Sequence, residues 1–450
     1  MKCIPAFFWQ IRHDRRDLAK TVKTLPYRIP LRDSIIAVCC IFFLLLCSVR
    51  GLAQDKYRIT GTVVNAANGT TIASASVFIT GTSKGTSTNQ IGNFVLTDLP
   101  HTGSYELVIS SIGFGTQVYA FTADSLPFSL TIMLKPKVTE LESVTIEPYE
   151  KDGWERWGRT FVESFIGTSA AARQCSIKNY KTLRFRYSKK TNTLIAVADE
   201  PLIIENKALG YRIKYQLEDF IYNMRERSLL FVGYTLFEDL SEDRNRVPRR
   251  WIVNRKHAYD GSIMHFIRSL CTNQLMNDGF EVRRMFKEPN LEKDRVKKVY
   301  AALWRRSSGT GSRIVMNSGD SVTVIGDSTS YYRQVLSQPD YVDIVIPRLM
   351  TADSVITRNS DSSAVLYFPN YLDVTYIKGK EEDEYLEHYR ETRKPGFQRS
   401  NVFLLQGNAV VIEASGAYFP PQEFFSAGYW AWSEKIAHLL PMDYDPKRLQ

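Results

Sequence analysis

The stretch from Ser74 to Pro100 constrains the fold of this chain more than any other. Apolar and polar residues alternate in it, the alternation breaks at glycines, and it then resumes (SASVFITGTSKGTSTNQIGNFVLTDLP). A period of two places one side chain in a core and the next one outside, as in half-buried strands. Glycines allow the tight turns between such strands. We therefore expect consecutive antiparallel strands here.

The same pattern extends over most of residues 54–134. Short runs rich in β-branched and aromatic residues recur at roughly the 8–12-residue spacing of a sandwich. They are Tyr57–Val64, Ala75–Thr80, Asn93–Leu96, Tyr105–Ser110, Gln117–Phe121 and Ser129–Leu134. The sequence thus predicts an antiparallel β-sandwich. The side chains expected to point into its core are Phe78, Phe94, Leu96, Val108 and Ile132.

This segment also resembles a known family. ITGTVVNAANGTTIASASVFITGTSKGTSTNQIGNFVLTDLP, followed by YELVISSIGFGTQ, is similar to a carboxypeptidase-regulatory-like domain, a prealbumin-like (Ig-like) sandwich. The matching features are Gly61, Gly81-Thr82, Gly85-Thr86, Gly92 before Phe94, and Ile112-Gly113-Phe114. The resemblance implies a Gram-negative envelope protein, because such a domain heads many TonB-dependent nutrient transporters. Many members carry an aspartate where Asn89 or Gln90 stands here, so no ion site is implied.

Residues 1–53 are typical of an export signal. A basic segment leads into the apolar run Ile35–Val49, and small residues precede a predicted cleavage between Ala53 and Gln54. The run is shorter than the roughly 20 residues that a bilayer-spanning helix needs. The alternative is an uncleaved helix anchored in the inner membrane, in which case residues 35–49 are the expected membrane contact. We expect an exported protein of the periplasm or outer membrane.

The net charge limits the class of partner, and the number of cysteines limits the disulfide bonds that the chain can form. The net charge is +10, but the first 53 residues hold nine basic and three acidic side chains, so +6 of it belongs to the leader. The remaining charge is too small to indicate a nucleic-acid partner. After the leader only Cys175 and Cys271 remain. They either pair in an oxidising compartment or are both small buried apolar residues, and the second interpretation is favoured.

The rest of the chain predicts an α+β multi-domain protein. An extended linker is expected at 135–150, a mixed α/β region at 151–300, a polar boundary or insertion at 301–320, and a β-rich region with a closing helix at 321–450. The middle region (GWERWGRTFVESFIGTS, EPLIIENKALGYRIKYQLEDF, AYDGSIMHFIRSL) resembles segments that follow the same domain in exported proteins of uncharacterised role. That resemblance implies no activity.

Local patterns place the expected elements. A helix begins near Asp152, with Trp154, Trp157, Phe161 and Phe165 on one face. A helical pair is expected at Arg249–Tyr259 and Ser262–Leu275, and a closing helix at Phe424–Leu440. Val402–Leu405 and Val410–Glu413 should form a hairpin. Further strands are expected at Leu183–Tyr187, Leu194–Ala198, Leu202–Asn206, Tyr211–Tyr222, Phe280–Met285, Val322–Ile325, Tyr341–Ile346, Ala364–Phe368 and Leu372–Ile377.

Two motifs suggest chemistry that their context does not support. His388 and Glu391 have a zinc-ligand spacing and His438 is a possible third ligand, but the surrounding run of charges favours a solvated helix face. Gly81-x-Ser83-x-Gly85 matches the serine-hydrolase pattern, but it lies between two strands, where both glycines serve a turn. The sequence therefore predicts no catalytic set, no metal site and no cofactor.

Five residues remain as surface candidates. His257 and His265 are eight residues apart and can share a helix face, where acid–base chemistry is conceivable, although structural histidines are more usual. Arg249, Arg250 and Trp251 belong to a basic cluster completed by Arg244, Arg246, Arg255 and Lys256. We expect a non-enzymatic binding or structural role in the envelope, with a protein or glycan partner. The alternatives are a hydrolase of unrecognised type and an accessory to a TonB-dependent uptake system.

Overall fold

The computed structural model describes residues 57–137, 148–242, 246–307, 328–359 and 363–447. The predicted export signal, including the apolar run at 35–49 and the site at Ala53 and Gln54, lies outside these ranges. So do most of the predicted linker and the predicted strand Val322–Ile325. Within the described ranges, no helix has the length and apolar character needed to cross a membrane. The protein has an α+β multi-domain architecture.

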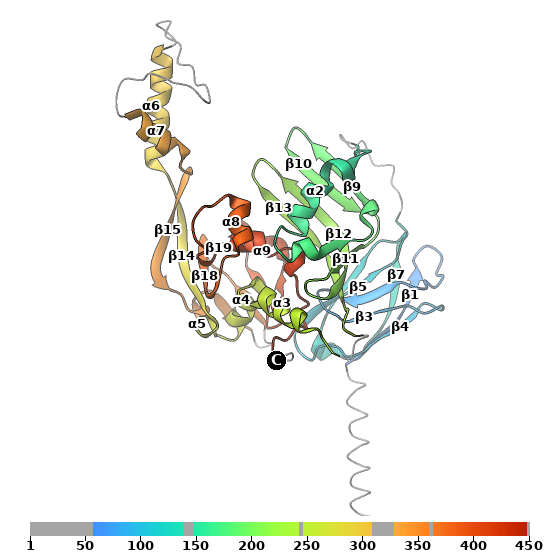
Figure 1. The fold of residues 1–450 in the computed structure, drawn as a ribbon. Coiled ribbons are helices and arrows are strands. Elements are labelled where there is room, and N and C mark those ends of the chain that lie inside the picture. Colours follow the sequence, from blue (N-terminus) through green and yellow to red (C-terminus); the bar gives the residue numbers. More distant parts are fainter. Residues whose placement is uncertain (1–56, 138–147, 243–245, 308–327, 360–362, 448–450) are drawn as a thin grey trace, which may run out of the picture. The chain divides into compact units, whose positions relative to one another are not determined.

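The N-terminal part is a β-sandwich, as the alternation predicts (Figure 1). Its strands are β1 (Ile59–Asn65), β2 (Ser76–Ile79), β3 (Gly85–Ser87), β4 (Asn93–Leu96), β5 (Ser104–Ser110), β6 (Gln117–Thr122) and β7 (Phe128–Leu134). One sheet has the order β4-β1-β7 and the other the order β3-β2-β5-β6. Phe94, Leu96 and Ile132 are buried in the core between them, as predicted, together with Ile59 and Leu107.

The middle sheet has the order β8-β11-β12-β10-β9, and β13 pairs with β12 as well. Its strands are β8 (Cys175–Ile177), β9 (Leu183–Ser188), β10 (Thr193–Ala198), β11 (Leu202–Asn206), β12 (Tyr211–Asn223) and β13 (Ser228–Asp239). Helix α2 (Gly153–Phe165) packs on it. Phe161 and Phe165 are fully buried in this core, and Trp154 and Trp157 are packed against it, which confirms the predicted apolar face.

Two further sheets enclose the C-terminal core. One, of order β15-β14-β18-β19-β22, contains β14 (Phe280–Pro289), β15 (Tyr341–Leu349), β18 (Tyr371–Lys380), β19 (Phe397–Leu404) and β22 (Phe424–Gly428). The other, of order β16-β17-β20-β21, contains β16 (Ile356–Arg358), β17 (Ser363–Leu366), β20 (Val410–Glu413) and β21 (Tyr418–Phe419). Val374 and Ile412, one from each sheet, lie in the same buried cluster as Phe266.

The remaining helices are α3 (Arg249–Tyr259), α4 (Ile263–Cys271), α5 (Leu275–Asp278), α6 (Leu291–Ser307), α7 (Ser328–Ser337), α8 (Asp383–Tyr389) and α9 (Tyr429–Ser433). The predicted helical pair is therefore present as α3 and α4. Gly279 ends α5 with φ of +100°, a conformation that favours glycine. Helices α6 and α7 come between β14 and β15 in sequence and extend from the ends of these two strands (Figure 1).

Two element predictions are wrong. Val402–Leu405 and Val410–Glu413 do not form a hairpin, because β19 pairs with β18 and β22 whereas β20 pairs with β17 and β21. The predicted closing helix Phe424–Leu440 is broken into β22, α9 and the 3-10 turn Ile436–His438. Gly428, with φ of +77°, ends the strand at the point where α9 begins, and Phe425 pairs with Phe403 across the sheet.

The Gly81–Gly85 loop is the predicted turn between β2 and β3, and it also joins the sandwich to the rest of the chain. The Gly81 amide donates to the Thr235 carbonyl at 2.7 Å, and the Met442 amide donates to the Gly81 carbonyl at 2.6 Å. The Ser83 hydroxyl donates to the Asp443 carboxylate at 2.5 Å. The hydrolase-like motif is thus a docking loop.

Phe78 and Val108 are buried, but they do not point into the core between the two sheets. They form a separate cluster with Leu236 of β13, on the outer face of the sheet. Their neighbours Val77 and Leu107 fill the sandwich core instead. Adjacent residues are buried on both faces here because β13 covers the second face, which the alternation in one domain cannot reveal.

Replacing Ser83 with alanine should loosen this docking. The variant loses a hydrogen bond to a charged acceptor, which contributes about 1.5–3 kcal/mol in proteins. We expect amide hydrogen exchange at Gly81 and Met442 to accelerate by about tenfold or more. The control is Ser125→Ala, which removes a hydroxyl hydrogen bond to Thr122 at 2.6 Å elsewhere in the sandwich. Equal exchange in the two variants would contradict the docking role of Ser83.

Candidate functional site

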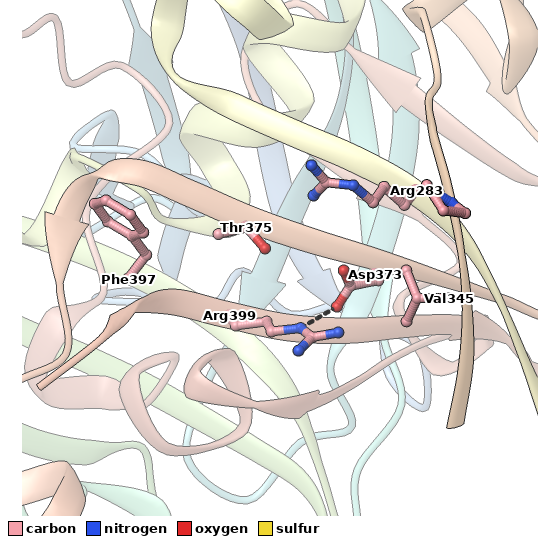
Figure 2. Close-up of a pocket in the computed structure, with 7 residues that line it drawn as sticks. Arg283, Val345, Asp373, Thr375, Phe397 and Arg399 are labelled. Atoms are coloured by element: carbon pink, nitrogen blue, oxygen red, sulfur yellow. Dashed lines mark hydrogen bonds and ion pairs between the residues drawn. The ribbon is translucent and has the colours of Figure 1, made fainter. Parts of the chain in front are cut away.

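A groove lies on the outer face of the sheet that contains β14, β18 and β19 (Figure 2). Its volume is about 500 Å³. The antiparallel register places Arg283 opposite Asp373, and Thr375 opposite Arg399. Directly opposed residues share a face, so these four side chains form the floor. The residues between them, such as Val282 and Val374, are buried on the inner face.

Ion pairs fix both arginines of the groove. Asp373 is only 2 % exposed, and its carboxylate accepts a hydrogen bond from Nε of Arg399 at 2.5 Å. Nη2 of Arg283 donates to Glu281 at 2.6 Å. Within the described part of the chain, Nη1 and Nη2 of Arg399 have no protein partner. The outer edge of this guanidinium is therefore available to a ligand.

The walls of the groove are apolar. Val345 and Pro347 come from the edge strand β15, and Phe397, which is 52 % exposed, stands at the start of β19. Figure 2 shows Phe397 and Thr375 on one side of the ion pair and Val345 on the other. Guanidinium donors between apolar walls can bind an anionic group that is attached to a carbon skeleton.

The two histidine candidates do not share a site. Helix α3 ends at Tyr259 and α4 begins at Ile263, with Gly261 at φ of +80° between them, so the helical spacing is interrupted. His257 is exposed, whereas His265 is buried. His265 accepts a hydrogen bond at Nδ1 from the Gly261 amide at 3.2 Å, and burial lowers its pKa to about 4. His265 is thus a neutral structural histidine, and not the surface residue that was predicted.

The basic cluster divides into two sets. Arg249 and Arg250 are exposed at the start of α3, as a surface role requires. Trp251, predicted at the surface, is 4 % exposed, and its Nε1 donates to the Lys207 carbonyl at 3.0 Å. Arg255 is 2 % exposed. Positions 251, 255, 258 and 259 lie on the buried face of α3, because a helix returns to the same side every three or four residues.

A small polar cavity of about 20 Å³ lies between His257, Glu382, Glu434 and His438. It has room for about one water molecule. Nδ1 of His438 lies 3.0 Å from the Ser433 carbonyl, so it must donate, and burial lowers the pKa of the ring. Nε2 therefore accepts from the Ser169 hydroxyl, 3.2 Å away.

This Ser169–His438 pair has the hydrogen bonding of a nucleophile and its base. Ser169, however, is 4 % exposed, does not line the cavity, and accepts a hydrogen bond from the Ala172 amide at 3.2 Å. A substrate carbonyl has no approach to its oxygen. The pair therefore stabilises the packing of the 3-10 turns Ala172–Gln174 and Ile436–His438.

Glu434 and its neighbour give the stability of the fold a particular pH dependence. Burial raises the pKa of Glu434 to about 7, and burial lowers the pKa of Lys435 to about 8. The folded protein keeps the Glu434 proton to higher pH than the unfolded chain does. Between about pH 4.5 and about pH 7 the unfolded state therefore binds fewer protons than the folded state. Stability consequently falls as the pH rises over that range.

Replacing Glu434 with glutamine should remove this fall. The free energy of unfolding of E434Q, relative to the wild type, should increase by roughly 2–3 kcal/mol between pH 4.5 and pH 7. Urea unfolding at a series of pH values measures it. Lys435→Met is the matched control. Lys435 releases its proton at a lower pH in the folded protein than in the unfolded chain, so its contribution to stability rises with pH between about 8 and 10.5. A constant difference between E434Q and the wild type would contradict the prediction.

The two cysteines of the described ranges are unpaired thiols, and the possible metal ligands there are not grouped. Cys175 and Cys271 are both free thiols, and burial raises their pKa values to about 12 and about 11. Thiols of that kind are protonated and unreactive at neutral pH. In the described ranges, no three His, Cys, Asp or Glu side chains are grouped so that they can hold a metal ion.

No local pattern in the sequence indicates the groove. Its residues come from four strands spread between Arg283 and Arg399, and no local spacing connects them. Ser169 and His438 are 269 positions apart, so the same holds for that pair. The available signal was weak: alternation in β18 places Asp373 and Thr375 on one face, but it does not show which strands flank them.

Comparisons with known proteins add little beyond the N-terminal domain. No curated protein matches the chain. A crystal structure of a 9R-lipoxygenase from Cyanothece PCC8801 is similar at 10 % identity and a TM-score of 0.15, and the match covers 48 % of each chain, so it spans about half of that enzyme. A Bacteroides fragilis NCTC 9343 protein of unknown function is similar at 9 % identity and a TM-score of 0.14, over 83 % of this chain and 95 % of that one.

The family comparison concerns the sandwich. The CarboxypepD_reg-like domain family matches residues 59–146. The match begins at the first residue of β1 and includes every strand of the two N-terminal sheets. Residues 59–146 are therefore a carboxypeptidase-regulatory-like domain.

Proposed function

We propose that this chain is an exported cell-envelope protein with a non-enzymatic binding role, and that the outer groove is its ligand site. The observation that supports it best is the guanidinium of Arg399, which lines the groove and which a buried carboxylate holds at Nε, while Nη1 and Nη2 have no protein partner within the described ranges. Side chains that are fixed before a ligand arrives lose little entropy on binding. The Ser169–His438 pair, by contrast, is closed to a substrate.

The location in the envelope is proposed from the sequence. The basic segment, the apolar run at 35–49 and the small residues before Gln54 are typical of a cleaved signal. A role beside a TonB-dependent uptake system is a narrower form of the same proposal, suggested by the proteins that carry this domain. In both forms of the proposal the sandwich is held in a fixed position on the rest of the chain, since it is docked to β13 and to Asp443.

Two measurements test the location. Fractionation of cells that produce the full chain should place it in the envelope fraction, and mass spectrometry of the purified protein should give Gln54 as the first residue. A protein with its leader intact in the inner membrane would support the anchor instead. An unprocessed protein in the cytoplasm would overturn export.

A third measurement tests binding. The mature protein, tagged and mildly crosslinked in envelope extract, should retain a partner that the double variant Asp373→Asn, Arg399→Gln does not retain. This variant removes both charges of the ion pair and leaves no unpaired buried carboxylate. Equal recovery with the two proteins would show that the groove is not the site. Recovery of nothing by either would contradict the binding role.

A further inference from the structure

We infer that the groove takes a carboxylate-bearing glycan, a conclusion that rests on the binding role proposed above. The first reason is the geometry of Arg399. Its Nε is held by Asp373, so the planar group is fixed and its two terminal nitrogens form a fork (Figure 2). A fork of this kind matches the two oxygens of a carboxylate, and lysine cannot replace it.

The second reason is that the groove has two such groups. Arg283 on β14 is held by Glu281 through Nη2 alone, and its Nε and Nη1 have no protein partner within the described ranges. Strands β14 and β19 flank β18, and the two arginines are opposite residues two positions apart on β18, so their Cα atoms are about 12 Å apart. A ligand that carries more than one carboxylate can contact both arginines.

The third reason is the apolar and hydroxyl surface beside the arginines. The ring of Phe397 is half exposed at the rim, and Thr375 lies beside Arg399 on the neighbouring strand. Sugar rings present C–H faces that pack on aromatic rings and hydroxyls that exchange hydrogen bonds with threonine. An inorganic anion uses the guanidinium groups but leaves Phe397 exposed.

The floor also disfavours an extended peptide. In the sheet order, β14, β18 and β19 each have a strand on both sides, so their backbone groups are occupied by the ladder. A peptide that adds a strand needs a free edge: the floor has none, and the edge strand that lines the groove, β15, contributes Pro347, which has no backbone N–H to donate. Recognition at the groove is therefore through side chains. This suits a glycan, whose carboxylates and ring faces carry its recognition.

The test is calorimetric titration of the mature protein with hexagalacturonate. We expect binding that weakens with salt, no comparable binding of maltohexaose, and a loss of about tenfold or more in affinity for Arg399→Lys and for the Asp373→Asn, Arg399→Gln double variant. Phe397→Ala should weaken binding as well. The matched control is Arg184→Gln, which breaks an exposed Arg–Asp pair on β9, away from the groove.

Three outcomes would overturn the inference. One is equal affinity in the wild type and the Arg399 variants, and another is equally tight binding of the neutral glycan. The third is binding of hexaglutamate peptide with no binding of hexagalacturonate. In that case the groove is a peptide site, and the binding role itself survives. Each variant should have the same thermal unfolding temperature as the wild type. A loss of affinity can then be assigned to the groove and not to a loss of folded protein.

Discussion

Replacing Arg255 with alanine should lower the free energy of unfolding by about 3 kcal/mol, the low end of the range for breaking a buried ion pair. Arg255 is 2 % exposed, and its guanidinium donates to both carboxylate oxygens of Asp239, at 2.8 and 3.0 Å. It also donates to the carbonyls of Leu209 and Gly210, at 2.7 and 3.2 Å. Alanine leaves all four acceptors without this donor.

The pKa of Asp239 gives the reason for the size of this effect. Burial pushes the pKa of Asp239 up, but hydrogen bonds from Arg255 and Ser241 outweigh burial and hold it below its usual value. Without Arg255 the carboxylate stays partly buried with less compensation. Urea unfolding at neutral pH measures the loss. Adding Asp239→Asn to R255A should restore part of it, because the amide carries no charge.

Arg250→Ala is the control for R255A, since Arg250 is exposed on the same helix. A change within about 0.5 kcal/mol is expected for such a surface position. If the two alanine variants unfold at the same urea concentration, Arg255 does not hold α3 against the ends of β12 and β13. The double variant would then show no recovery either.

Replacing Gly61 with valine should destabilise the sandwich by about 3 kcal/mol or prevent its folding, the upper end of the usual cost of overpacking. Strand β1 lies between β4 and β7. A Cβ atom at Gly61 would lie 2.3 Å from the Leu130 carbonyl oxygen and 2.8 Å from the Phe94 ring. The ring can move, but the carbonyl belongs to the paired backbone of β7 and cannot.

Gly115→Val is the matched control for Gly61→Val. The nearest atom to a Cβ at Gly115 is the Lys135 carbonyl oxygen at 3.7 Å, an ordinary contact. Thermal unfolding of the two purified variants compares them directly. We expect a large loss for Gly61→Val and a small one for Gly115→Val. Similar unfolding temperatures would show that β1 tolerates a side chain at position 61.

The sequence predicted the elements whose pattern of apolar residues depends on a single sheet or a single helix. Strand β4 alternates cleanly because its sheet buries only the face toward the sandwich core, and α2 shows its apolar face at helical spacing. β13 was missed because Leu236 and Phe237, although adjacent, are both buried, one against the sandwich and one in the middle core. Two partners on two faces remove the alternation by which strands are recognised.

The wrong elements and the missed site have the same physical cause. The apolar residues of Phe424–Leu440 recur at helical steps and most are buried, but the backbone before Gly428 is taken up by pairing with β19. A local pattern does not show which strand competes for the backbone. The groove likewise depends on the pairing of four strands, and pairing partners cannot be read from the spacing of residues along the chain.

The bond between Ser83 and Asp443 joins positions 360 residues apart. An N-terminal domain generally folds as a unit while synthesis continues, but this contact cannot form until the chain has been made as far as Asp443. Phe78 and Val108, by contrast, are covered by Leu236 of β13 and need the chain only as far as that strand. The outer face of the sandwich is thus the surface that a chaperone would find exposed on a nascent chain until β13 has been made.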